Sequence, residues 1–168
     1  MSALVIRPAT EADLPGVLAL HAQPDLDAGA VLEPEAARDL FRRFALYPDY
    51  VLYVAEDEGG IVGTHALLVM DNFGHLGARS AVVEGVAVAP DRQSAGIGAA
   101  MMRHAMAVAA EKGCYKLALS SGSRRTRAHA FYEGLGFARH GVSFHVDLAP
   151  PISAPPVPGP LQPAEAGQ

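Results

Sequence analysis

Glu84 is a carboxylate that stands alone in an apolar stretch. It is the single acid in AVVEGVAVA, residues 81–89, and it precedes Gly85, a residue type that often marks a β-bulge. A carboxylate in such a strand is either solvated at an edge or directed into a cleft, where burial would raise its pKa toward the range of a general base. Glu84 is therefore a candidate general base, and the solvated alternative stays open.

Tyr132 is a candidate for the opposite proton transfer. A phenol with an ordinary pKa of ~10 stays protonated at neutral pH, and it can donate to a thiolate whose conjugate acid has a pKa near ~8.5. Its neighbour Phe131 supports a second interpretation, in which Tyr132 is a core residue of a short helix. The residues alone favour the core interpretation.

The histidines and the cysteine lack the spacing of a metal site. The seven histidines include no H-x-x-x-H or H-E-x-x-H pattern, and Cys114 is the single cysteine. We therefore expect no metal. His75 lies in the turn-rich stretch DNFGHLG, which begins at Asp71, and both residues are candidates for substrate contact. A surface loop residue is the alternative for His75.

Two glycines interrupt the start of a helical run in PDRQSAGIGAAMM, residues 90–102. A glycine inside a helix costs about 1 kcal/mol relative to alanine, so Gly96 and Gly98 need a physical reason. The first turn of a helix has unpaired N–H groups and a partial positive charge, which together bind anions. The loop predicts either a phosphorylated ligand on the N–H groups of residues 95–99 or a tight strand-to-helix turn without a ligand.

Other glycine motifs narrow the choice of ligand. A P-loop is excluded because Ala99 and Ala100 follow Gly98, where Lys and Ser or Thr would be needed. A dinucleotide fingerprint needs a small residue at its third position, where this chain has Met101. The basic stretch SSGSRR, residues 120–125, could still hold a 2′-phosphate, so an NADP site remains an alternative.

The order of hydrophobic periods predicts an α/β fold. Segments of period 2 and period 3.6 follow in the order β-α-α-β-β-β-α-β-α-β, with one βαβ unit near the centre. This order implies a mixed, mostly antiparallel central sheet with helices on both faces. The expected helices are residues 10–20, with Thr10 as N-cap, 33–46, 96–113 and 127–135. The expected strands are residues 4–6, a hairpin within 49–70, 80–90, a buried strand at 114–121, and one or two within 136–148.

Composition limits the class of protein. The chain has 168 residues, of which 50% are hydrophobic and 18% charged, and its net charge of −5 disfavours nucleic-acid binding. No apolar run approaches the ~20 residues of a membrane helix and no signal peptide is evident, so we expect a cytoplasmic protein without membrane association. We expect one domain over residues 1–148 and a flexible, proline-rich tail over residues 149–168.

From about Leu4 to Leu148 the sequence resembles the GNAT superfamily of N-acetyltransferases. The resemblance is carried by the opening LVIRPATEAD, by Gln93-x-x-Gly96-x-Gly98 after the strand, and by AHAFYEGLGF, residues 128–137. Its C-terminal half resembles the branch that acetylates small amines, including aminoalkylphosphonates and amino sugars. The resemblance implies an acyl-CoA N-acyltransferase fold with acetyl-CoA as co-substrate.

The resemblance also implies roles for individual residues. The backbone of Val86, Ala87 and Val88 would pair with the pantetheine arm, and the Val86 N–H would polarise the thioester carbonyl. Tyr132 would be the acid and Glu84 the base. Arg125 replaces an asparagine that many members have, and its guanidinium would reach a CoA phosphate instead. The pyrophosphate would lie on the loop formed by Gln93, Ser94, Ala95, Gly96, Ile97, Gly98 and Ala99.

These observations predict direct transfer of an acetyl group from acetyl-CoA to a primary amine of a small molecule. A protein N-terminus or a lysine is an alternative acceptor. A non-catalytic acyl-CoA-binding module is the alternative from another class of protein, because it would share the glycine loop. Members of the family often dimerise, so a homodimer is a further expectation.

Overall fold

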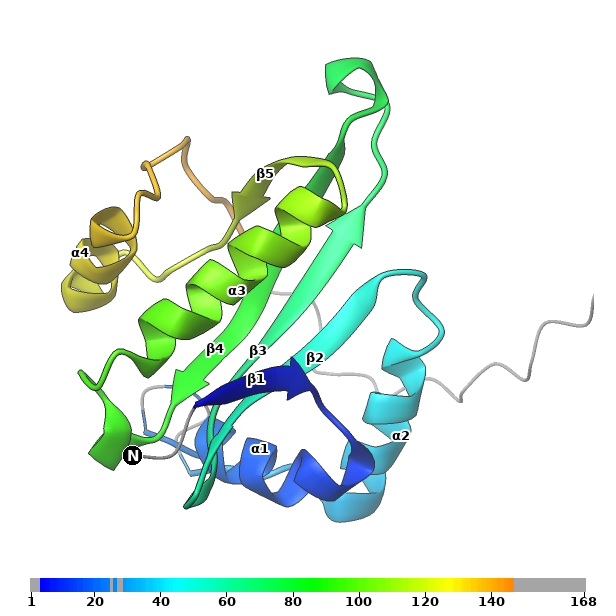
Figure 1. Ribbon diagram of the computed structural model, residues 1–168. Coiled ribbons are helices and arrows are strands. Elements are labelled where there is room, and N and C mark those ends of the chain that lie inside the picture. The colour runs from blue at the N-terminus through cyan, green and yellow to red at the C-terminus, as the bar shows by residue number, and fades with distance from the viewer. Residues whose placement is uncertain (1–3, 25, 27–28, 147–168) are drawn as a thin grey trace, which may run out of the picture.

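The chain builds a five-stranded sheet with helices packed against it (Figure 1). The computed structural model describes residues 4–24, 26 and 29–146. The expected tail and the domain boundary at residue 148 lie outside the described residues. The strands follow one another across the sheet in chain order: β1 (Val5–Pro8), β2 (Tyr50–Asp57), β3 (Gly60–Met70), β4 (Arg79–Val88) and β5 (Cys114–Ala118).

The sheet is mixed. The pairs β1–β2, β2–β3 and β3–β4 are antiparallel, whereas β4 and β5 are parallel. The parallel pair is connected by α3 (Ile97–Glu111), because parallel neighbours need a crossover rather than a tight turn. The predicted mixed, mostly antiparallel sheet with a central βαβ unit is therefore confirmed.

Helices cover both faces of the sheet, as predicted. On one face α1 (Leu14–His21) contacts β3 and β4, and α2 (Pro34–Phe44) contacts β2, while α3 covers β3, β4 and β5 on the other face. The last helix, α4 (Thr126–Gly134), lies beside the start of α3. None of the helices that the structure describes is long and apolar enough to span a membrane.

The main core lies between α3 and the sheet. Met101, Met102 and Ala105 of α3 are fully buried in one cluster with Val83 of β4. Burying a methionine or valine side chain stabilises the fold by about 1.5–3 kcal/mol, so this cluster fixes α3 over β4. Gly63 of β3 allows the close approach, because a Cβ there would lie 2.5 Å from the Met101 sulfur.

Asp13 joins β1 to the first helix. Its carboxylate accepts hydrogen bonds from the Thr10 N–H at 2.7 Å and the Thr10 hydroxyl at 2.9 Å. It also accepts two bonds from the Arg7 guanidinium, at 2.8 and 2.9 Å. The predicted helix start at Thr10 is confirmed, with a 3-10 turn over Glu11–Asp13 before α1.

The expectation of a buried strand at 114–121 is wrong in two respects. β5 ends at Ala118, and Tyr115 in its middle is 42% exposed. The reason is its position, since among the described residues β5 is an edge strand that pairs with β4 alone. A strand with one neighbour has an open side, whatever its sequence suggests about burial.

Within the described part of 136–148, which ends at residue 146, no strand forms, although one or two were expected. Val142, Phe144 and Val146 alternate as they would in a strand, yet all three are strongly exposed. A groove of about 620 Å³, lined by residues 116–121 and 137–143, runs between this segment and β5. Alternation alone does not make a strand, because a ladder needs a partner backbone about 4.8 Å away.

Candidate active site

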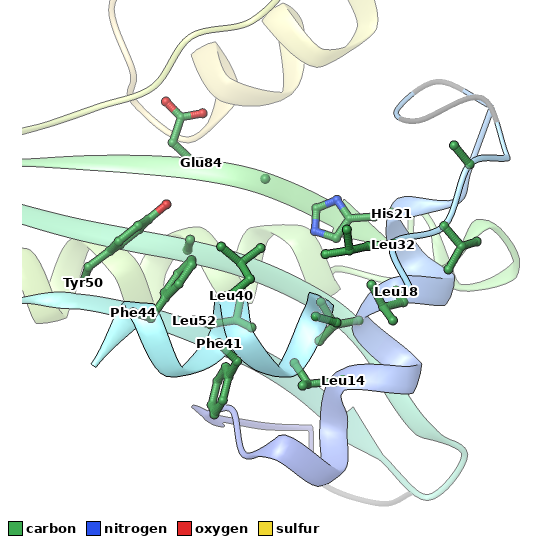
Figure 2. Close-up of a pocket in the computed structure, with 16 residues that line it drawn as sticks. Leu14, Leu18, His21, Leu32, Leu40, Phe41, Phe44, Tyr50, Leu52 and Glu84 are labelled. Atoms are coloured by element: carbon green, nitrogen blue, oxygen red, sulfur yellow. The ribbon is translucent and has the colours of Figure 1, made fainter. Parts of the chain in front are cut away.

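A cavity of about 300 Å³ lies between the first two helices and the sheet (Figure 2). Helix α2 turns the side chains at positions 37, 40, 41 and 44 into it, the spacing of one helical face. The sheet contributes side chains from the face opposite α3. The cavity is lined by Leu14, Val17, Leu18, His21, Ala30, Val31, Leu32, Ala37, Leu40, Phe41, Phe44, Tyr50, Leu52, Ala66, Glu84 and Gly85.

A β-bulge in β4 places Glu84 at the mouth of this cavity. Ala66 pairs with Glu84 and Thr64 pairs with Ala87, so two residues of β4 oppose one residue of β3. Gly85 has a φ of +61°, a conformation that favours glycine. The bulge expected at Gly85 is therefore confirmed. Glu84 lines the cavity and is also exposed, so solvent reaches its carboxylate.

Aromatic rings lie at the Glu84 end of the cavity. Phe44 and Tyr50 stack with ring centroids 4.1 Å apart and an interplanar angle of 18°. In Figure 2 they lie with Glu84 toward one end, and Leu14, Leu18 and His21 lie toward the other. Burial raises the pKa of the Tyr50 phenol, and the negative charge of Glu84 adds to that shift. A donor hydroxyl and a carboxylate therefore share this end of the cavity.

β4, which carries Glu84, separates from its neighbour β5 halfway along its length. β4 and β5 pair from Arg79 to Val82 of β4, whereas β4 continues to Val88. The second half of β4, including Val86, Ala87 and Val88, thus has no β5 partner in the register. This is the part of the strand predicted to pair with pantetheine, and its edge is open for such a partner.

The glycine loop follows directly on β4. A 3-10 turn, Pro90–Arg92, leads through Gln93 to Ser94, whose φ is +65°, and to Gly96, whose φ is +84°. Gly96 is the N-cap of α3. The N–H groups in the first turn of a helix have no carbonyl partner within the helix and point out of its N-terminal end. The Arg127 guanidinium donates to the Ser94 hydroxyl at 3.2 Å, which brings a cation to this loop.

Gly98 has a steric reason of its own. A Cβ at this position would lie 3.2 Å from the Phe131 ring and 3.7 Å from a methyl group of Val88. Gly98 therefore lets α4 approach α3 and β4 closely, and Gly96 meets the need for positive φ. Both glycines are explained by the turn and the packing, with or without a ligand on Ala95, Ile97 and Ala99.

Tyr132 lies on α4 and packs onto the edge of the main core. Its ring centroid is 5.1 Å from that of Phe131 and 5.7 Å from that of Phe137. Burial raises the pKa of its phenol, and the nearby Arg125 guanidinium opposes that shift. Tyr132 is therefore a protonated donor at neutral pH. It lines the groove beside β5 rather than the cavity that Glu84 lines.

The structure does not bring His75 and Asp71 to the cavity. His75 is in a 3-10 turn, His75–Gly77, with its ring centroid 4.1 Å from that of Tyr115. Asp71 accepts a hydrogen bond from Arg79 at 3.0 Å. Both lie between β3 and β4, beyond the end of the sheet (Figure 1). Their contact with a substrate stays a prediction that this cavity does not support.

Two polar residues of the cavity were missed at the sequence level. His21 ends α1, and its ring lies against the bulge, since a Cβ on Gly85 would be 3.2 Å from the His21 Cε1 atom. Tyr50 begins β2 next to Glu84. Neither has a motif around it. Within the described ranges, no group of three or more His, Cys, Asp and Glu side chains is placed to hold a metal ion.

The sheet that opens between β4 and β5, the turn into α3 and the bulge at Glu84 define the architecture of an acyltransferase. Residues 18–137 match the Acetyltransferase (GNAT) family, and the chain belongs to this family. The resemblance noted in the sequence is therefore confirmed.

Two curated relatives are identical to this chain at about a third of the aligned positions. A glucosamine 6-phosphate N-acetyltransferase from Trypanosoma brucei brucei is 32% identical over 97 residues, 58% of this chain and 64% of that protein. The match thus spans less than two thirds of that relative. A rice protein (Oryza sativa subsp. japonica) named "Probable glucosamine 6-phosphate N-acetyltransferase 2" is 33% identical over 76% of this chain and 74% of its own length.

The fold is found in solved structures as well. The crystal structure of an acetyltransferase from Trypanosoma brucei superposes with a TM-score of 0.76 and is 28% identical. The match covers 87% of this chain and 100% of that chain.

Proposed function

We propose that this protein transfers an acetyl group from acetyl-CoA to a primary amine of a small molecule. The observation that carries the proposal is the course of β4. Its bulge holds Glu84 at the mouth of a cavity, its next residues have an open edge toward β5, and α3 begins just beyond its end. An acceptor site and a thioester site would therefore meet on one strand. Membership of the acetyltransferase family supports the same conclusion.

The residues present fit acetyl-CoA. The open edge at Val86–Val88 would pair with the pantetheine arm. The loop from Gln93 to Ala99, with the first N–H groups of α3, would bind the pyrophosphate. Arg125, at the N-cap of α4, and Arg127 supply positive charge near that loop. We propose each of these residues as a contact for acetyl-CoA.

The proposed chemistry needs one base and one acid. Glu84 takes the proton that the amine must lose, and the amine nitrogen forms a bond to the acetyl carbon. The bond from that carbon to sulfur breaks, and Tyr132 donates its proton to the departing thiolate. The proton held by Glu84 then passes to solvent, and solvent returns one to the Tyr132 phenolate. The balance is a primary amine and acetyl-CoA giving an N-acetylated amine and CoA with a free thiol.

The curated relatives support a small amine acceptor, since both are named for the acetylation of an amino sugar phosphate. A cytoplasmic location and a homodimer stay predictions from the sequence.

The test is acetyl-CoA turnover with a panel of primary amines, following free thiol and identifying the product by mass spectrometry. We expect thiol and N-acetylated amine in equal amounts. In Glu84→Gln, kcat should fall roughly 10²-fold or more, the usual contribution of a general base. Calorimetric binding of acetyl-CoA without turnover on any amine would instead indicate an acyl-CoA-binding module. Tight binding of NADPH alone would indicate the NADP site.

A further inference from the structure

We propose that the acceptor is an amine with an apolar body and no anionic group, held in the cavity between α1, α2 and the sheet. This inference rests on the proposed function, because it names the class of acceptor for that same reaction. It differs from the acceptor in the names of the two curated relatives, which is a sugar phosphate.

The lining of the cavity carries the inference. Of its sixteen residues, thirteen have apolar side chains or none, and the others are His21, Tyr50 and Glu84. Hydroxyl groups of a sugar would need several hydrogen-bond partners here, because a hydroxyl buried without one costs about 1–3 kcal/mol. The cavity offers an aliphatic and aromatic wall instead, and its volume of about 300 Å³ is that of a small ligand site.

Charge in and around the cavity excludes a phosphate more strongly. No lysine or arginine is among the residues that line it in the described part of the chain. Among the described residues that connect α1 to α2, which are 22–24, 26 and 29–33, Glu33 is the one charged side chain. A phosphate monoester carries about −1.5 to −2 charges at neutral pH, and such a group is buried only with paired cations.

None of the three arginines of α2 lines the cavity, and the partners of two of them are known. Arg38 donates to Glu35 at 2.6 Å, and Arg42 donates to Glu11 at 3.2 Å. Both are partners of carboxylates on the exposed side of the helix, whereas the cavity takes the face of Ala37, Leu40 and Phe44.

The cationic end of an amine fits the end of the cavity at which Glu84 lies. Glu84 supplies a negative charge at the mouth, and the Phe44–Tyr50 stack supplies aromatic faces at the same end of the cavity. An ammonium group is attracted by both, by about 0.5–1 kcal/mol for an exposed cation–π contact alone. Glu84 then takes the proton, as in the proposed reaction, while the apolar body stays between α1 and α2.

The test compares 2-phenylethylamine, glucosamine and glucosamine 6-phosphate as acceptors with acetyl-CoA. We expect kcat/KM for 2-phenylethylamine to exceed that for glucosamine 6-phosphate by at least about 10-fold, since burying a few apolar carbons gives this much discrimination. The Leu40→Lys variant should lose at least about 10-fold in kcat/KM for 2-phenylethylamine. Leu46→Lys is the matched control, because Leu46 is 53% exposed and lies outside the cavity, and it should keep the wild-type value.

A binding measurement separates the acceptor class from the reaction. Calorimetry with each amine in the presence of CoA should show heat for 2-phenylethylamine that Leu40→Lys removes, while acetyl-CoA binding and the melting temperature stay near wild type. Preference for glucosamine 6-phosphate, in turnover or in binding, would overturn the acceptor class and leave the acetyltransferase proposal intact. Binding of 2-phenylethylamine without any acetyl transfer would support the acceptor class and overturn the proposed reaction. Absence of 2-phenylethylamine binding would overturn the acceptor class.

Discussion

Tyr132 and Glu84 reach their proposed roles through opposite environments. Tyr132 packs between Phe131 and Phe137, and burial raises the pKa of its phenol. Glu84 is exposed at the mouth of the cavity, where its charge is solvated and available to a cationic amine. A half-buried acid and a solvated base on different elements suit a reaction in which one proton leaves the acceptor and another reaches the thiolate.

Replacing Tyr132 by phenylalanine removes only the hydroxyl group and so tests its proposed role as the general acid. We expect kcat to fall roughly 10²-fold or more, because the thiolate would leave without its donor, while the Kd for acetyl-CoA changes little. Stopped-flow thiol release and calorimetry measure the two quantities. The control is Tyr115→Phe, which removes a hydroxyl from a 42% exposed side chain on β5. Unchanged kcat in Tyr132→Phe would remove Tyr132 from the mechanism.

At the scale of elements, β4 organises the site. Its first half pairs with β5, its second half does not, and the bulge lies between Glu84 and Ala87. The bulge also gives α1 its contact with the strand, because the ring of His21 takes the space that a side chain at Gly85 would fill. The shape of one strand thus sets the positions of the acceptor cavity and of the open edge.

The bulge can be tested by Gly85→Ala. A left-handed φ of +61° is unfavourable for alanine by roughly 1–2 kcal/mol, and the new Cβ would press on His21. We expect the free energy of unfolding to fall by about that amount in urea titrations and acetyl transfer to fall with it. Gly134→Ala in α4 is the control, since a Cβ there meets no atom within 4 Å, and it should not destabilise the protein. Equal stabilities of the two variants would contradict the strained bulge.

The ion pair between β1 and α1 makes a second prediction for these elements. Hydrogen bonds from Arg7, and then from Thr10, hold the pKa of Asp13 well below its ordinary value, against the effect of burial. The stability that this pair contributes is present above the unfolded pKa of about 3.9 and is lost as the pH falls below it. Asp13→Asn should cost about 1.5–3 kcal/mol at pH 7, the usual value of hydrogen bonds to a charged group. Urea unfolding at pH 7 and pH 3 should show a larger difference between the variant and wild type at pH 7.

At the scale of the whole molecule, the core beneath α3 contains a buried histidine. His65 of β3 is fully buried, and neither of its ring nitrogens has a hydrogen-bond partner in the described part of the chain. It stacks on Tyr53 with ring centroids 5.2 Å apart, and the His104 ring lies 6.2 Å away. Burial lowers the pKa of His65 to about 4, and the positive charge of His104 acts in the same direction.

This histidine gives the fold a dependence on acid. Between pH 6.5 and about 4 the unfolded chain binds a proton at His65 that the native protein does not bind, so stability falls as the pH falls through this window. The shift corresponds to about 3 kcal/mol. His65→Leu should reduce the pH dependence of the unfolding free energy from pH 6.5 to 4, and His104, whose pKa burial also lowers, should account for part of the slope that stays. The decline below pH 4, to which Asp13 contributes, should stay. A variant with the wild-type slope from pH 6.5 to 4 would show that His65 is not the titrating group.

Much of the fold was predictable because its signals are local. The stripe of Ala37, Leu40, Phe41 and Phe44 identifies an amphipathic helix, and Gly85 identifies the bulge from its neighbours alone. The strands expected over residues 136–148 do not form in the described part, which ends at residue 146, since a strand depends on a partner elsewhere in the chain. The stripe of α2 does not by itself predict a cavity, because a residue that lines a cavity and one that fills a core have the same spacing.

The sequence by itself determined the family, the order of elements, the glycine turn into α3 and the isolation of Glu84, because each of these depends on residues close together in the chain. Only the tertiary structure decided what surrounds Glu84. The cavity is assembled from α1, α2, β2, β3 and β4, and its apolar, cation-poor lining exists in no single segment. Acceptor class follows from that lining, since burial and charge are properties of side chains that folding brings together from distant positions.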